Sequence, residues 1–322
     1  MATDLNQIAQ PNATERAPWL AGVVPPVCTP LTDELEVDQA SLERLIGTLL
    51  EGGVSGLFML GSSSEGAFFR QDQRDLVIEV AVKCAGGQVP VIAGAIDTAT
   101  ARVCESAQRA VALGVDGIVV TAPFYALSTR PDELERHFRT IKAATNSRLL
   151  AYDIPVSVNC KLPPHVMAEL ALEGVVDGIK DSSGDIAAMR ELVMATRALS
   201  EFTILTGSQV IVDCAILAGA DGVVPGLGNV DPAAYVDLCR ACAQQDWSRA
   251  RLIQERLCRL FRITRCADAR IHGPTAAGLG AFKTALQLRG IFTTNALALP
   301  QQALDAAESS AVRGILEEMD LL

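Results

Sequence analysis

The stretch VVDGIKDSSG, residues 175–184, joins a short apolar run to a single lysine. Two valines, a turn-prone Asp-Gly pair and an isoleucine precede Lys180, and this pattern predicts a short buried strand. Because an apolar environment disfavours an ammonium, a lysine held there supplies a neutral amine that can attack a ketone and form a Schiff base. The protonated Schiff base is an electron sink for making or breaking an adjacent carbon–carbon bond. A surface lysine at a strand end is the alternative interpretation.

The other lysines have less favourable settings for this chemistry. Lys83, Lys142 and Lys283 fall within predicted helices, and Lys161 follows a predicted strand end. Lys180 is therefore the candidate nucleophile.

Composition narrows the functional class of the 322-residue chain. It is 49% hydrophobic and 20% charged, which suits a large α/β domain. The net charge is −11 and basic runs are absent, so we expect neither a nucleic-acid nor a membrane partner. Nine scattered cysteines and three separated histidines form no metal-ligand spacing, which predicts reduced thiols in a cytoplasmic protein without a metal site.

Around the lysine stretch, a strand followed by a helix recurs eight times. The strands are continuous apolar runs, as expected for a parallel sheet that is covered on both faces. We therefore predict an α/β fold, a (β/α)₈ TIM barrel over residues 19–245, after a flexible N-terminal arm (1–18) and before a C-terminal helical subdomain (246–322). An open doubly wound sheet is the alternative. The predicted strands are 23–31, 56–61, 90–95, 117–123, 148–155, 175–183, 202–208 and 222–226.

Polar residues follow several of these strands, where a barrel collects its functional groups. The Gly-Ser-Ser-Ser turn at residues 61–64 can offer backbone N–H groups and hydroxyls to a small carboxylate. Helix capping by serine, with Glu65 completing a capping box, is the other interpretation of this turn. Tyr125, Tyr152 and Lys180 follow or end three further strands.

These strand ends carry four motifs that resemble those of the dihydrodipicolinate synthase and N-acetylneuraminate lyase family of pyruvate-dependent class I aldolases. The resemblance covers roughly residues 22–290. Its motifs are GSSSEG (61–66), APFY (122–125), YDIP (152–155) and GIKDSSGD (178–185). It implies a Schiff-base lyase or aldolase, a small 2-oxo acid substrate such as pyruvate, no cofactor, and a homotetramer.

The same resemblance implies roles for individual residues. Lys180 would form the Schiff base, and Tyr152 would move the proton at the reacting bond. Ser62 and Ser63 would hold the pyruvate carboxylate, and Ser62 would also relay protons from Tyr152. Tyr125 would complete this relay, in the family often from a neighbouring subunit. The remaining role, a backbone carbonyl facing the site, falls to Val224.

Three departures from the family pattern narrow the substrate. Ser64 stands where the family usually has glycine, and Ser157 where most synthases have an arginine for the second carboxylate. A neutral serine cannot form that bidentate pair. At the seventh strand, residues 207–209 lack the acidic groups with which sialic acid lyases hold a glycerol tail. We therefore expect an uncharged second-substrate pocket lined by Ser157, Asn159, Ser208 and Gln209.

The leading hypothesis is a lyase or aldolase that makes or breaks a bond between pyruvate and an aldehyde, on a 2-keto-3-deoxy sugar acid or similar 2-oxo acid. One alternative is a dehydratase that uses the same lysine imine to expel water. The others are dihydrodipicolinate synthase activity and a non-catalytic protein that binds 2-oxo acids.

Overall fold

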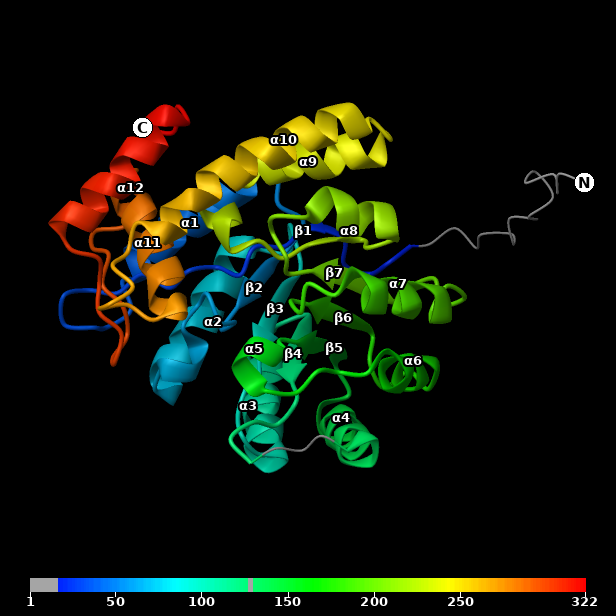
Figure 1. The fold of residues 1–322 in the computed structure, drawn as a ribbon. Coiled ribbons are helices and arrows are strands. Elements are labelled where there is room, and N and C mark those ends of the chain that lie inside the picture. Colours follow the sequence, from blue (N-terminus) through cyan, green and yellow to red (C-terminus); the bar gives the residue numbers. More distant parts are fainter. Residues whose placement is uncertain (1–16, 127–129) are drawn as a thin grey trace, which may run out of the picture.

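The computed structural model describes residues 17–126 and 130–322, so the predicted arm at residues 1–18 lies almost wholly outside the described part. Eight parallel strands form one sheet in the order β1-β8-β7-β6-β5-β4-β3-β2 (Figure 1). The strands are β1 (Gly22–Val23), β2 (Leu57–Met59), β3 (Val91–Gly94), β4 (Gly117–Thr121), β5 (Arg148–Asp153), β6 (Gly178–Asp181), β7 (Thr203–Thr206) and β8 (Gly222–Val223).

The two ends of this sheet meet and close the barrel. A parallel bridge joins Pro26 to Phe58, and Val27 N donates to Phe58 O at 2.9 Å. The (β/α)₈ barrel is thereby confirmed, and the open-sheet alternative is wrong. The first strand is shorter than the predicted range 23–31, because Pro25 and Pro26 have no backbone N–H for a sheet ladder.

Strand register places the candidate residues at one level of the barrel. Thr121 is opposite Tyr152 between β4 and β5, and Tyr152 is opposite Lys180 between β5 and β6. Lys180 is in turn opposite Leu205 of β7. Successive side chains of a strand point to opposite faces of the sheet, so residues two positions apart share a face. The register between strands therefore decides which side chains meet at the carboxyl end of the barrel.

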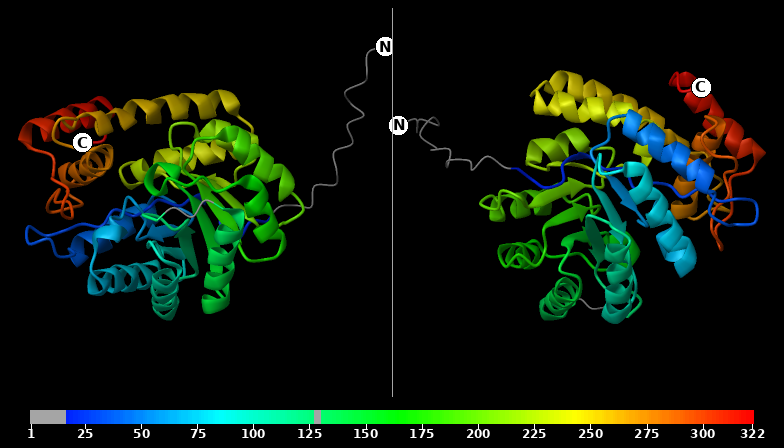
Figure 2. Two further views of the ribbon diagram at one scale, coloured as in Figure 1. Left: turned by 60° about the horizontal axis from the view of Figure 1, so that its bottom comes forward. Right: turned by 180° about the vertical axis from the view of Figure 1, so that it is seen from behind.

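Helices surround the sheet (Figures 1 and 2). Several begin where local chemistry favours a start: Asp38, Asp185 and Asp231 each accept a bond from a first-turn backbone N–H. The four-residue helix after β5 was not predicted. These helices are α1 (Gln39–Glu51), α2 (Gln71–Ala85), α3 (Thr100–Ala112), α4 (Pro131–Thr145), α5 (Pro155–Val158), α6 (Pro164–Leu172), α7 (Ile186–Ala195), α8 (Val212–Ala218) and α9 (Pro232–Ala243).

Three further α-helices follow the barrel, as predicted: α10 (Trp247–Leu260), α11 (Pro274–Leu288) and α12 (Ala306–Glu318). In Figures 1 and 2, α12 packs against α11. Arg44 Nε on α1 donates to Ile291 O at 3.0 Å, just after α11. Short 3₁₀ helices occupy Gly66–Phe68, Gly226–Asn229 and Phe261–Arg265. Within the described residues, no helix combines the length and the apolar character needed to cross a membrane.

Candidate active site

Lys180 projects from β6 into an aromatic environment. It is 4% exposed, and its Nζ lies 4.0 Å from the ring centroid of Tyr152 and 4.8 Å from that of Phe58. Gly207 lies alongside, and a Cβ there would overlap Ser182 Oγ and come within 3.3 Å of Lys180 Cε. Glycine at residue 207 thus lets the end of β7 approach the side chains of Ser182 and Lys180 closely.

The other lysines either form ion pairs or are exposed. Lys142 forms an ion pair with Asp177 at 2.8 Å, and Lys83 lies exposed on α2. Lys161 and Lys283 are each paired with a carboxylate. Within residues 17–126 and 130–322, Lys180 is therefore the buried lysine without an ion pair.

Tyr152 links this lysine to the serine turn. Its hydroxyl lies 3.3 Å from Ser62 Oγ, and either oxygen can donate. Burial by itself raises the pKa of Tyr152. The charge of Lys180, together with hydrogen bonds involving Ser62, Lys180 and Ser182, outweighs burial and lowers this pKa below its usual value of 10.0. The phenol is therefore a better proton carrier than a free tyrosine.

The serine turn at residues 61–64 is held by backbone hydrogen bonds, and its left-handed residue is the one that follows it. Ser64 N donates to Gly61 O and Glu65 N to Ser62 O, each at 3.1 Å. The positive φ falls on Glu65, at 59°, and not on Ser64. Serine in place of the family's glycine is thus accommodated. Ser62 remains exposed and Ser63 half-buried, so both hydroxyls can face a ligand.

Glu65 does not complete a capping box: it makes no capping hydrogen bond. Its carboxylate pairs with Lys283 of α11 and accepts a bond from Ala298 N at 2.7 Å. Lys283 also donates to Ala296 O at 2.8 Å, and both paired side chains are fully buried. Sequence reasoning missed this pair, which ties the serine turn to the C-terminal helices.

A second buried carboxylate holds the loop after β5. Asp153 pairs with Lys161 and accepts from Leu162 N at 3.1 Å. Burial raises the pKa of Asp153, although both of these contacts act to lower it. The pair closes the loop that contains α5 and Ser157.

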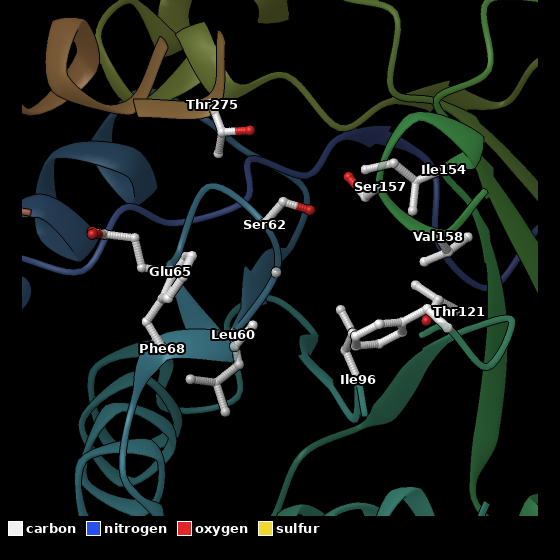
Figure 3. Close-up of a pocket in the computed structure, with 13 residues that line it drawn as sticks. Leu60, Ser62, Glu65, Phe68, Ile96, Thr121, Ile154, Ser157, Val158 and Thr275 are labelled. Atoms are coloured by element: carbon white, nitrogen blue, oxygen red, sulfur yellow. The ribbon is translucent and has the colours of Figure 1, made fainter. Parts of the chain in front are cut away.

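A cavity of ≈ 240 Å³ opens beside Ser62. Figure 3 shows Ser157 and Thr275 on different sides of this cavity, with Ser62 between them. The described lining residues are Leu60, Gly61, Ser62, Glu65, Ala67, Phe68, Ile96, Thr121, Phe124, Ile154, Ser157, Val158 and Thr275.

Of the four residues expected to line a second-substrate pocket, Ser157 lies on this cavity. Asn159, Ser208 and Gln209 are not among its described lining residues. Asn159 ends α5 in the left-handed conformation, with φ 52°. Gln209 Oε1 accepts from Leu227 N at 2.7 Å, and this side chain lines a second cavity that also touches Ser62 and Ser63.

The two remaining candidate residues, Val224 and Tyr125, differ in burial. Val224 is buried just after β8, where its N–H donates to Thr206 O at 2.8 Å. Tyr125 is 95% exposed, with φ 77°, and does not line the cavity beside Ser62 of its own chain. One chain therefore brings together Lys180, Tyr152 and Ser62, but not Tyr125.

Known proteins resemble this chain in sequence and in fold. A family model described as the dihydrodipicolinate synthetase family matches residues 19–319. An uncharacterized DapA-like lyase of Halobacterium salinarum is 33% identical over 94% of this chain and 95% of its own. The 4-hydroxy-tetrahydrodipicolinate synthase of Thermotoga neapolitana is 30% identical over 94% of this chain and 99% of its own.

Among solved structures, YagE, a prophage protein of Escherichia coli K12 in complex with pyruvate, superposes with a TM-score of 0.86. It is 26% identical over 94% of this chain and 99% of that chain.

Proposed function

Since the chain belongs to the dihydrodipicolinate synthetase family and is a class I lyase or aldolase, we propose that Lys180 forms its Schiff base with pyruvate or another 2-oxo acid. The observation that carries this proposal is the setting of Lys180: buried, without an ion pair among the described residues, and over the rings of Tyr152 and Phe58. The pyruvate complex of the structural relative supports pyruvate as the ketone.

In the cleavage direction, the amine of Lys180 attacks the C2 ketone of a 4-hydroxy-2-oxo acid, and water leaves as the imine forms. Tyr152 takes the proton of the C4 hydroxyl, the C3–C4 bond breaks, and its electron pair moves to the imine nitrogen. An aldehyde departs. Return of the proton to C3 and hydrolysis of the imine release pyruvate and the free amine.

Ser62 and Ser63 bind the carboxylate in this scheme, with Ser62 also relaying protons from Tyr152. The Val224 carbonyl faces the same site. The substrate class is a 2-keto-3-deoxy sugar acid or a similar 2-oxo acid. A neutral Ser157 in the cavity speaks against the second carboxylate that dihydrodipicolinate synthase activity requires. A dehydratase reaction by the same imine is the second candidate, and analysis for pyruvate and aldehyde products distinguishes the two.

We further propose a homotetramer in which Tyr125 completes the relay of a neighbouring subunit. Its 95% exposure supports this assignment. Light scattering of the purified chain tests it, and a monomer would remove the role. We also propose a cytoplasmic location, which the scattered spacing of the nine cysteines along the sequence supports.

The deciding experiment is intact mass after incubation with pyruvate and borohydride. We expect one reduced pyruvate per chain in the wild type and in Lys83→Ala, which removes an exposed lysine, and none in Lys180→Ala. An adduct that persists in Lys180→Ala would refute the assignment. Absence of any adduct would favour a non-catalytic binding protein.

A further inference from the structure

The residues that line the cavity beside Ser62 indicate which kind of second substrate would fit. It lies next to the proposed proton relay, although Tyr152 and Lys180 are not among its described lining residues. Two residues on its wall adjoin Tyr152: Ser62, whose Oγ lies 3.3 Å from the Tyr152 hydroxyl, and Thr121, its register neighbour. The loop directly after Tyr152 supplies Ile154 and Ser157 to the wall. A group attached to the carbon that reacts at C3 of pyruvate would therefore extend into this cavity.

We propose that this group is apolar and uncharged, so that the aldehyde partner of pyruvate is an aromatic or branched aliphatic aldehyde. The inference rests on the proposed Schiff-base function, and among the 2-oxo acids named there it favours one with an apolar aldehyde part over a 2-keto-3-deoxy sugar acid. In the synthetic direction, C3 of the Lys180 enamine bonds to the aldehyde carbon, and the aldehyde oxygen takes a proton from Tyr152. Water then hydrolyses the imine, releasing a 4-hydroxy-2-oxo acid and the free amine.

The wall of the cavity is predominantly apolar. Seven of its side chains are hydrocarbon, and two of these are phenylalanines: Leu60, Ala67, Phe68, Ile96, Phe124, Ile154 and Val158. A cavity of about 150 Å³ with such a lining holds a benzene ring. The ≈ 240 Å³ present here is enough for a ring with its aldehyde carbon.

The charges around the cavity exclude a carboxylate. Glu65 is the one ionisable residue among its described lining residues, and its carboxylate is already bound by Lys283 and Ala298 N. A substrate carboxylate would lose its hydration without gaining a cation.

A substrate with several hydroxyl groups would lose their hydration in this cavity and would find few hydrogen-bond partners there. Apart from Ser62, the exposed hydroxyls on the wall are those of Ser157 and Thr275, and Figure 3 places them on different sides of the cavity. Two separated neutral hydroxyls can form a hydrogen bond with a single polar substituent of a substrate that is otherwise apolar.

The test is aldol condensation of pyruvate by the full chain with four aldehydes: benzaldehyde, isobutyraldehyde, glyceraldehyde and succinic semialdehyde. We expect kcat/KM for the first two to exceed that for the last two by at least about tenfold, the discrimination that one or two methylenes of apolar contact provide. A preference for glyceraldehyde or for the semialdehyde would overturn the inference.

Ser157→Arg supplies the missing cation and should raise kcat/KM for succinic semialdehyde about tenfold or more while lowering it for benzaldehyde. The matched control, Ser157→Ala, leaves the cavity uncharged and should give no such gain. An equal gain with alanine would contradict the electrostatic argument.

Borohydride trapping separates failure of this inference from failure of the proposed function. If the pyruvate adduct forms on Lys180 but no apolar aldehyde condenses, the substrate class is wrong and the Schiff-base assignment stands. If no adduct forms, the proposed function fails first.

Discussion

Replacement of Glu65 by glutamine tests whether the serine turn depends on its link to α11. Both side chains of the Glu65–Lys283 pair are 0% exposed. Removing one partner of a buried ion pair typically costs about 3–5 kcal/mol, because the remaining charge is left without a counter-charge. A domain of this kind has a free energy of unfolding of only about 5–15 kcal/mol, so the loss is readily measured.

The assay is urea unfolding of wild type, Glu65→Gln and the double variant Glu65→Gln/Lys283→Met. The double variant removes both charges, so that no uncompensated charge stays buried, and it should recover much of the lost stability. Lys142→Met serves as the control for a partly exposed pair. The Lys142 and Asp177 side chains are 24% and 29% exposed, and we expect a cost of about 1 kcal/mol or less.

Glu65 N also donates to Ser62 O in the turn that contains the proposed carboxylate ligands Ser62 and Ser63. Folded Glu65→Gln should therefore show a higher KM for pyruvate together with slower formation of the trapped adduct. A destabilisation below about 1 kcal/mol with an unchanged KM would refute the reasoning. A double variant no more stable than the single one would show that the unpaired charge is not the cause.

Four further outcomes are expected. Tyr152→Phe should lower kcat by about 10²–10⁴-fold, measured as steady-state product formation, while a pyruvate adduct can still be trapped; an unchanged kcat would remove Tyr152 from proton transfer. Because the pKa of Tyr152 is lowered, its deprotonated form is available at lower pH than in free tyrosine, so the rising limb of kcat/KM against pH should have its midpoint below 10. Ser62→Ala removes a hydrogen bond that lowers this pKa and should move the limb to higher pH; a stationary limb would be the contrary result. Gly207→Ala introduces a Cβ that overlaps Ser182 Oγ and should slow adduct formation at least about tenfold in stopped-flow trapping, whereas Gly47→Ala, with nothing within 4 Å of its new Cβ, should not.

The positions of several candidate active-site residues could be predicted from the sequence, because a barrel brings the ends of successive strands together at one face. Lys180 and Tyr152 each end an apolar run, and the carboxyl ends of parallel strands meet at one face. The serines at 62–63 follow the end of another strand in the same way. These positions depend on short-range patterns, so hydrophobic periodicity and turn residues were sufficient to predict them.

The sequence by itself therefore determined the eight-unit barrel, the three helices after it and the lysine, tyrosine and serine at the strand ends. Tertiary structure alone decided that Glu65 is bound by Lys283 and by Ala298 N, 233 positions away in the chain. It also decided that Ser157 is on the cavity beside Ser62 while Asn159 is not. Such contacts depend on how loops and helices fold back over the barrel mouth, and no local periodicity encodes that packing.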